Sequence, residues 1–187
     1  MGTSVPTKPM IFMKPATAIT SDEKPYYIPT WTEDLQHEVE LVVKIKKNGK
    51  SIHPDFANDY YDSVGLGIDF TARDIQAKCK AKGHPWEISK SFDHSALLSK
   101  EFIPYETFIS EGSKFRIEKN REIAQQGDTS LMVFTINELI VYISQYFTLQ
   151  KGDLIYTGTP SGVSKILPNH KYEGFINNQK MFTLKVK

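Results

Sequence analysis

The sequence predicts a mainly β domain with a few helices, an α+β fold. Turn-forming residues are frequent, with 11 glycines and 10 prolines among 187 residues, and they divide the chain into short segments. Many of these segments are apolar runs of strand length that are rich in β-branched and aromatic residues. Only two stretches show helical spacing. We therefore expect one compact domain over residues 1–187.

The opening of the chain predicts no helix, because five of the ten prolines precede Thr30 and proline removes a backbone donor. Short apolar runs then follow through the rest of the chain, and each has the length and composition of a strand. The last of them alternates in polarity and is expected to close a sheet. The expected strands are Met10–Met13, Val39–Ile45, Val64–Ile68, Phe108–Ile109, Phe147–Leu149, Leu154–Thr157 and Met181–Val186.

Two stretches predict helices. The first begins at a segment that resembles a capping box, Thr71–Asp74, places Ile75 and Cys79 on one face, and stops at Gly83. The second, Ser130–Tyr146, is dense enough in apolar residues for a mostly buried helix. Cys79 faces inward on the first helix, which predicts a buried structural thiol.

Composition excludes several classes of protein. Twenty-three basic residues against 22 acidic ones leave a net charge of +1, so no electrostatic argument favours nucleic acid or an anionic membrane surface as a partner. The sequence has no run of about 18 apolar residues, and Met1–Lys14 lacks the pattern of a secretory leader. A single cysteine cannot form an internal disulfide, which favours a reducing compartment, the cytoplasm.

The most informative local pattern is a pair of carboxylates in a strand. Side chains alternate between the two faces of a strand, so Glu38 and Glu40 share one face while His37 and Val39 share the other. Two carboxylates at this spacing repel each other unless positive charge lies between them. The pair is therefore either an exposed charged strand, with lysines over it, or part of a cation site.

A third acid strengthens the second interpretation. Asp69 ends the apolar run Val64–Ile68 and precedes the expected helix start at Thr71. A carboxylate in that place can point into a pocket, although it can also be a simple helix-entry residue. Three carboxylates without cysteine or a convergent histidine would form an all-oxygen site, which favours Mg²⁺, Mn²⁺ or Ca²⁺ over zinc.

Two basic residues keep both a functional and a structural interpretation. Arg73 follows Asp69 by one helical turn and can orient the acids or pair with Asp74. Lys14 can reach a substrate or lie exposed before Pro15.

Five segments in a fixed order resemble a known family. They are Glu38-x-Glu40, Gly67–Gln76, Pro85-Trp86, Lys90–Phe92 and Gly152–Val163. Together they resemble the fumarylacetoacetate hydrolase family, and most closely its small acylpyruvate hydrolase and oxaloacetate decarboxylase branch. Each segment alone is a weak signal, but five in order are a strong one. The likeness covers nearly the whole chain, from Phe12 to the last expected strand.

This resemblance implies a mixed β-sandwich roll and a homodimer, for which the 12% aromatic content leaves enough apolar surface. It also implies that Glu38, Glu40 and Asp69 hold Mg²⁺ or Mn²⁺ and that Lys90 is catalytic. Gln76 is expected to line the substrate site, and Thr159 to contact the substrate carboxylate. Arg73 and Lys14 complete the expected substrate-binding set.

The activity that the resemblance implies is metal-dependent cleavage of a C–C bond in a small 2-oxo acid, by a hydrolase or lyase. Cleavage places negative charge on the keto oxygen as an enolate, which a metal ion and an ammonium group would stabilise. The group that leaves is carbon dioxide from oxaloacetate, or an acyl group attacked by water in an acylpyruvate. The alternatives are an isomerase or decarboxylase of aromatic-catabolism dioates, and a catalytically impaired metal-binding homologue.

One part of the family pattern has no counterpart in this sequence. Members of this branch usually carry, ahead of the segment that matches Phe12–Pro15, a glycine-arginine-asparagine-tyrosine motif and a short lid whose His and Glu activate water. No residue matches those lid positions, and His37 is expected to point away from the acids. The 187-residue chain is therefore expected to keep metal binding and slow oxaloacetate decarboxylation, but to hydrolyse acylpyruvates poorly.

Overall fold

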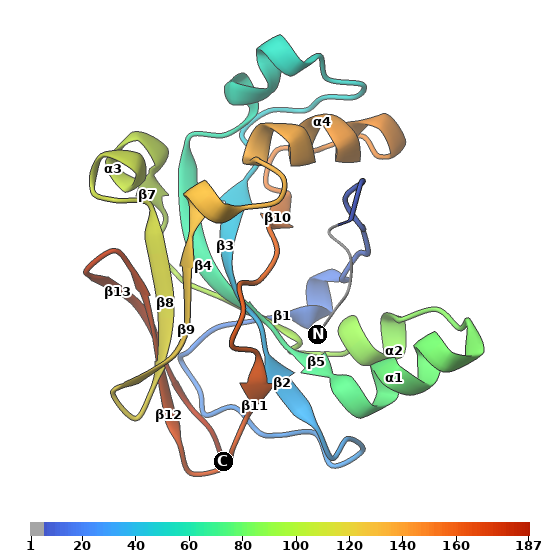
Figure 1. The fold of residues 1–187 in the computed structure, drawn as a ribbon, viewed down its shortest axis with the longest axis vertical. Helices are drawn as coiled ribbons and strands as arrows, with labels where there is room; N and C mark the ends of the chain where they lie inside the picture. Colours follow the sequence, from blue (N-terminus) through green and yellow to red (C-terminus); the bar gives the residue numbers. More distant parts are fainter. Residues whose placement is uncertain (1–5) are drawn as a thin grey trace.

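The computed structural model describes residues 6–187, and its largest element is a mixed β-sheet of six strands (Figure 1). The strand order is β1-β6-β4-β3-β10, and β7 pairs with β4. Only β1 and β6 run parallel; the other pairs are antiparallel. The strands are β1 (Ile19–Thr20), β3 (Val39–Lys44), β4 (Ser63–Asp69), β6 (Ala96–Leu98), β7 (Ile103–Pro104) and β10 (Leu154–Tyr156).

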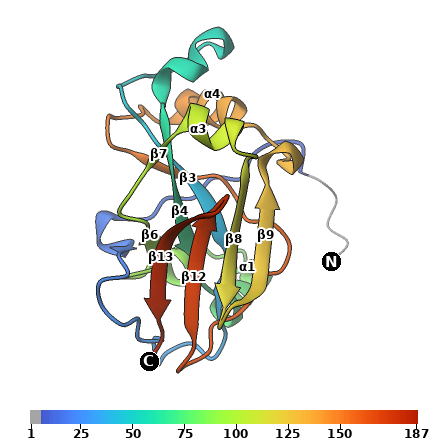
Figure 2. The ribbon, with the colours of Figure 1, turned by 90° about the vertical axis from the view of Figure 1, so that its left-hand side faces the viewer.

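A four-stranded antiparallel sheet in the order β13-β12-β8-β9 packs on the first, as Figure 2 shows. Its strands are β8 (Lys114–Lys119), β9 (Glu122–Asp128), β12 (Lys171–Ile176) and β13 (Gln179–Lys185). A third, small sheet joins β11 (Ser164–Lys165), β2 (Leu35–His37) and β5 (Thr71–Ala72).

The apolar core lies between the two larger sheets. Leu41 and Leu66 from the first sheet and Ile117 and Leu184 from the second are fully buried members of one cluster. Removing these side chains from water is the main stabilising contribution in a fold of this kind. The arrangement confirms the expected fold class, a mainly β roll with few helices.

The helices lie around the rim of the sheets (Figure 1). A capping box begins α4: the Thr135 hydroxyl accepts from the Glu138 N–H, and the Glu138 carboxylate accepts from the Thr135 N–H. None of the helices within residues 6–187 is long and apolar enough to cross a membrane. The α-helices are α1 (Arg73–Lys82), α2 (Glu87–Lys90), α3 (Tyr105–Ser110) and α4 (Ile136–Tyr146), and the 3₁₀-helices are η1 (Ala16–Ala18), η2 (Pro54–Tyr60) and η3 (Thr129–Leu131).

Four of the expected strands are confirmed, as β3, β4, β10 and β13. The first expected helix is also confirmed, and Gly83 ends it in the left-handed conformation (φ 65°). The capping box expected at Thr71 is wrong, because Thr71 is paired in a strand and α1 begins without a side-chain cap. Cys79 is buried, as expected.

Three expected strands are wrong. Phe108–Ile109 lies in α3, and a two-residue apolar run carries no periodicity that separates a helix from a strand. Met10–Met13 forms no strand, and Phe147–Leu149 contributes only a single bridge from Leu149 to Gly49. The second helix begins at Ile136 instead of Ser130, because the Thr135 cap fixes its start.

Candidate metal and substrate site

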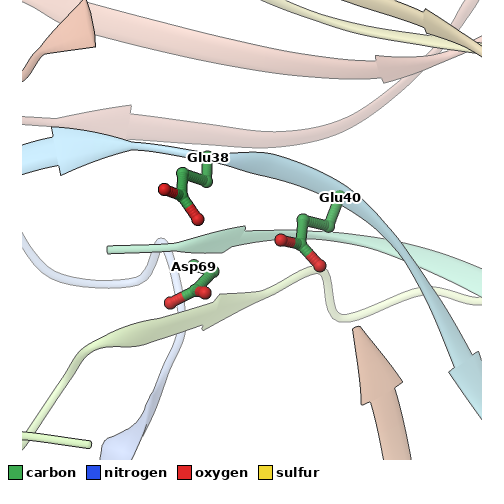
Figure 3. A group of neighbouring side chains, drawn as sticks. All are labelled: Glu38, Glu40 and Asp69. Carbon is green, nitrogen blue, oxygen red and sulfur yellow. The ribbon is translucent and has the colours of Figure 1, made fainter. Parts of the chain in front are cut away.

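Glu38, which directly precedes β3, lies together with Glu40 of β3 and Asp69 of β4 (Figure 3). Val39 is paired with Ile68, and the Asp69 N–H donates to the Glu38 carbonyl (2.8 Å), so Glu38 and Asp69 are side by side. Each of the three acids offers a carboxylate oxygen within 4.8 Å of the others. Alternation along the chain places Glu38 and Glu40 on one face, and Asp69 at the end of β4 lies next to them. The three predicted ligands are thus brought together.

All three acids are buried, with exposed fractions of 8% for Glu38, 5% for Glu40 and 2% for Asp69. Buried carboxylates are costly unless cations or hydrogen-bond donors face them. These findings exclude the interpretation of an exposed charged strand. Three basic residues supply the compensating charge: Lys90, Lys14 and Arg73.

Lys90, at the end of α2, directs its ammonium group at two of the acids. Its Nζ donates to Glu38 Oε2 (2.7 Å), to Asp69 Oδ2 (2.6 Å) and to the Thr71 hydroxyl (2.6 Å). Burial alone would lower the pKa of Lys90, but the charges of Asp69 and Glu38 outweigh it and raise the pKa above the usual value. Lys90 is therefore held as a cation within reach of the acids.

Lys14 approaches Asp69 from the N-terminal segment. Its Nζ lies 2.8 Å from Asp69 Oδ1 and donates to the carbonyl and hydroxyl oxygens of Ser95 (3.0 Å each) and to the Lys90 carbonyl. Burial lowers the pKa of Lys14, and the neighbouring Asp69 offsets only part of that effect. The side chain is not an exposed lysine before a proline.

Arg73, at the start of α1, forms an ion pair with Glu38 and donates to the side-chain oxygens of Gln36 (2.9 Å) and Gln76 (2.7 Å). Asp74 is held elsewhere, by the Thr32 hydroxyl (2.5 Å). Of the two interpretations of Arg73, the structure therefore favours the one in which it orients an acid.

The acids differ in their electrostatic surroundings. Burial and the neighbouring charges of Asp69 and Glu38 raise the pKa of Glu40 to about 8, and one hydrogen bond, from the Gly158 N–H (2.8 Å), opposes the shift. Burial also acts to raise the pKa of Glu38, but Lys90 and Arg73 outweigh it and hold that pKa below the usual value.

A cavity of about 890 Å³ opens beside the acids. Glu40, Asp69, Lys14 and Thr159 line its polar part, together with Tyr156. The rest of its wall comes mainly from the N-terminal segment, from α4 and from the chain on either side of α4, and is largely apolar. These apolar residues include Phe12, Leu131, Val133, Leu139, Ile143 and Phe147.

The remaining predicted substrate residues have different places. The Thr159 side chain lines the cavity, but its hydroxyl donates its proton to the Val39 carbonyl (2.9 Å). This hydroxyl therefore has no proton left to donate to a ligand. Gln76 is buried (3% exposed), accepts from Arg73, and is not among the residues that line the cavity.

Several residues of the site were not predicted. Thr71 and Ser95 hold the two lysines, and Tyr156 lines the cavity and donates to the Leu97 carbonyl (2.8 Å). Gln125 contacts Thr159. No spacing in the sequence indicates these residues, because their contacts join segments that are far apart in the chain.

The three acids fit a hard divalent cation. Mg²⁺ and Mn²⁺ prefer oxygen ligands, and oxygens that share one octahedral ion lie about 3–4 Å apart. The carboxylate oxygens here span up to 4.8 Å, so small side-chain movements would bring them to that spacing. The donor set has no sulfur or imidazole, which disfavours zinc.

A family model described as fumarylacetoacetate (FAA) hydrolase C-terminal matches residues 2–186. The chain belongs to the fumarylacetoacetate hydrolase family. This match confirms the resemblance carried by the five sequence segments, and it covers the sheets, the acids and the cavity described above.

Relatives and solved structures of this family agree with the fold. The chain is 40% identical over 188 residues to mouse "Oxaloacetate tautomerase FAHD1, mitochondrial", a match that covers 100% of the chain and 85% of the relative. A crystal structure of a fumarylacetoacetate hydrolase family protein from Yersinia pestis superposes with a TM-score of 0.92 at 34% identity, covering 100% of this chain and 85% of the other.

Another solved structure that this chain resembles contains a metal ion. It is that of fumarylpyruvate hydrolase from Pseudomonas aeruginosa in complex with Mn²⁺ and pyruvate. The TM-score is 0.86 at 29% identity, and the match covers 94% of this chain and 77% of that one.

Proposed function

We propose that this chain is a Mg²⁺- or Mn²⁺-dependent enzyme that acts on a small 2-oxo acid. The observation that carries the proposal is the group of three buried carboxylates, Glu38, Glu40 and Asp69, beside a cavity and two lysines. A divalent ion bound there would bind the substrate's oxygens and withdraw electrons from its keto group. The Mn²⁺ and pyruvate in the fumarylpyruvate hydrolase relative support this choice of ion and ligand.

The side chains around the acids have separate roles in this proposal. Lys90 stabilises the negative charge that develops on the keto oxygen when an enolate forms, as a donor held in place before the reaction. Lys14 lines the cavity next to Asp69 and attracts the substrate carboxylate. Arg73 holds Glu38 in place, Gln76 supports the Arg73 guanidinium, and Thr159 borders the substrate.

The proposal also names the reaction that the enzyme performs on the 2-oxo acid. Cleavage of the C3–C4 bond and keto–enol tautomerisation both place charge on the same keto oxygen, and the mouse relative is an oxaloacetate tautomerase. We keep C–C cleavage of an acylpyruvate or of oxaloacetate as the leading reaction. The second candidate, isomerisation of a dioate, would use the same acids and the same lysine.

An assay with two substrates and a chelator tests the proposal. Oxaloacetate and acetylpyruvate would be offered to the chain with Mg²⁺ and, separately, with EDTA, and both pyruvate and the enol form of the substrate would be followed. We expect turnover of at least one substrate that EDTA abolishes. Metal binding without turnover of either substrate would favour a non-catalytic metal-binding homologue. Equal rates with Mg²⁺ and with EDTA would contradict the proposal.

A homodimer and a cytoplasmic location complete the proposal. Apolar side chains are exposed on the chain, among them Leu131 (81%), Ile123 (60%) and Val133 (57%), and an interface between two copies would cover such residues. Light scattering that returned a 21 kDa particle at micromolar concentration would contradict the dimer. The cytoplasmic location rests on the single cysteine, and cell fractionation would test it.

A further inference from the structure

Gln125, on β9, is a buried amide (2% exposed) whose hydrogen-bonding groups are all in use. Its Oε1 accepts from the Val39 N–H (3.1 Å) and lies 2.6 Å from His37 Nδ1. Its Nε2 donates to Thr159 Oγ1 and to the Pro160 carbonyl (3.0 Å each). A buried amide with every donor and acceptor satisfied holds its partners in fixed relative positions.

The partners determine the orientation of this amide. The Pro160 carbonyl can only accept, so it faces the NH₂ group, and the Val39 N–H can only donate, so it faces the oxygen. His37 Nδ1, next to the same oxygen, therefore carries a proton. The other ring nitrogen of His37 lies 2.8 Å from the Ser164 hydroxyl.

The two ends of the amide connect the two sides of the candidate site. His37 and Val39 flank Glu38 in the chain. Residues 157–160 lie in the loop after β10, and in this segment, called the turn below, the Gly158 N–H donates to Glu40 Oε2 (2.8 Å). The Thr159 hydroxyl accepts from Gln125 and donates to the Val39 carbonyl, which closes a ring of hydrogen bonds between the turn and the strand.

The chain after this turn also packs closely on β9. A β-carbon at Gly162 would lie 2.8 Å from the Ala124 carbonyl oxygen, closer than such atoms approach one another, and 3.1 Å from Gln125 Cγ, which is a tight contact. Gly162 also has a positive φ of 101°. The close approach shows that the turn and the loop after it are docked on β9 at Gln125.

We infer that Gln125 is a positioning residue, which fixes the turn of Gly158 and Thr159 against the strand segment that carries Glu38 and Glu40. An effect of this positioning on ligand binding is expected only if the proposed function holds. Gln125 acts through Thr159 and through the Gly158 N–H. Loss of Gln125 should therefore loosen the turn while the centre of the sheet stays intact.

Hydrogen exchange of single amides tests this inference directly. Gln125→Glu keeps the acceptor end but loses both donors to the turn, and Gln125→Met is an uncharged variant of similar length. In at least one of these folded variants we expect the Gly158 amide to exchange more than tenfold faster, with Val43, at the centre of the β-sheet, unchanged. Gln179→Met, at an exposed glutamine of β13 in the four-stranded sheet that also contains β9, is the control. Equal acceleration at Gly158 and Val43, or none at Gly158, would overturn the inference.

A double-mutant cycle tests whether Gln125 acts through Thr159. The probe is pyruvate, titrated into the Mn²⁺-loaded protein, with the variants Gln125→Met, Thr159→Val and the double variant. If Gln125 acts through Thr159, the double variant loses no more pyruvate affinity than the more affected single variant. Losses that multiply would overturn action through Thr159. A wild-type chain that binds neither Mn²⁺ nor pyruvate would defeat the proposed function, whereas the amide exchange would still decide the role of Gln125.

Discussion

Lys90 Nζ lies 2.6 Å from Asp69 Oδ2 and so joins the end of α2 to the end of β4. The same ammonium contacts Glu38 and Thr71, so each of its three N–H groups has a partner. Lys90, the predicted catalytic residue, is therefore also a counter-ion of the acids.

The first prediction separates these two roles of Lys90. We expect Lys90→Met to lower turnover of oxaloacetate by roughly a hundredfold or more, since loss of a preorganised donor costs on the order of 3 kcal/mol in the transition state. The Mn²⁺ affinity should change far less than turnover, because the substitution removes no metal ligand. Lys78→Met, an exposed lysine of α1, is the matched control.

Steady-state kinetics and Mn²⁺ titration of both lysine variants make the comparison. An equal loss of turnover and of metal affinity in Lys90→Met would show that Lys90 acts only as a counter-ion.

The second prediction concerns competition between Lys14 and the metal ion. The Lys14 ammonium lies 2.8 Å from Asp69 Oδ1, a predicted ligand atom, and lines the same cavity. A divalent cation in that place would be repelled by it. We therefore expect Lys14→Met to tighten Mn²⁺ binding, by at least about threefold in calorimetry, while the pyruvate affinity of the Mn²⁺-loaded protein falls. Weaker Mn²⁺ binding in Lys14→Met would mean that Lys14 supports the metal site.

The third prediction is that metal binding releases a proton. A pKa of about 8 leaves Glu40 largely protonated at pH 7 in the metal-free protein, and a metal ligand must be ionised. Calorimetry at pH 6.5 in two buffers of different ionisation enthalpy should therefore show release of about one proton. The apparent affinity should rise with pH up to about 8 and then level off.

The stability of the fold without metal depends on pH in the opposite direction from the metal affinity. The folded state holds the Glu40 proton up to about pH 8, whereas the unfolded chain releases it near the usual glutamate pKa of 4.5. The folded state thus binds more protons in that interval, and the free energy of unfolding contributed by Glu40 falls as pH rises through it. Glu40→Gln should remove this slope and the proton release together. An unchanged proton release in Glu40→Gln would assign the proton to another group.

The predictable part of the site follows from local rules. Alternation along a strand places Glu38 and Glu40 on one face, and the end of an apolar run places Asp69 beside a helix start. Gln125 could not be found in this way, since its partners lie 34 to 88 positions away and depend on how β9 meets β2 and β3. Contacts between distant segments of the chain, and not a local sequence pattern, make Gln125 part of the site.

The same contrast holds for the fold. Strands β3 and β4 are apolar runs buried on both faces, and the sequence predicts them directly. Strand β12 (Lys171–Ile176) contains the charged residues Lys171 and Glu173 and was not predicted. It pairs with β8 on one side and β13 on the other, and these backbone hydrogen bonds hold it in the sheet. In the same way, the tertiary position of Phe108, fully buried, outweighs its strand-like composition.

The central claim is that Glu38, Glu40 and Asp69 form one metal site, and thermal unfolding with and without Mn²⁺ tests it most directly. A ligand that binds only the folded state stabilises it by about 2.7 kcal/mol at a hundredfold excess over its Kd. We expect Mn²⁺ to raise the Tm of the wild-type chain by several degrees and to raise it equally in Glu33→Gln, an exposed control. Glu40→Gln and Asp69→Asn should each lose most of that increase while remaining folded. A Tm increase that persists unchanged in both variants would contradict the three-carboxylate site.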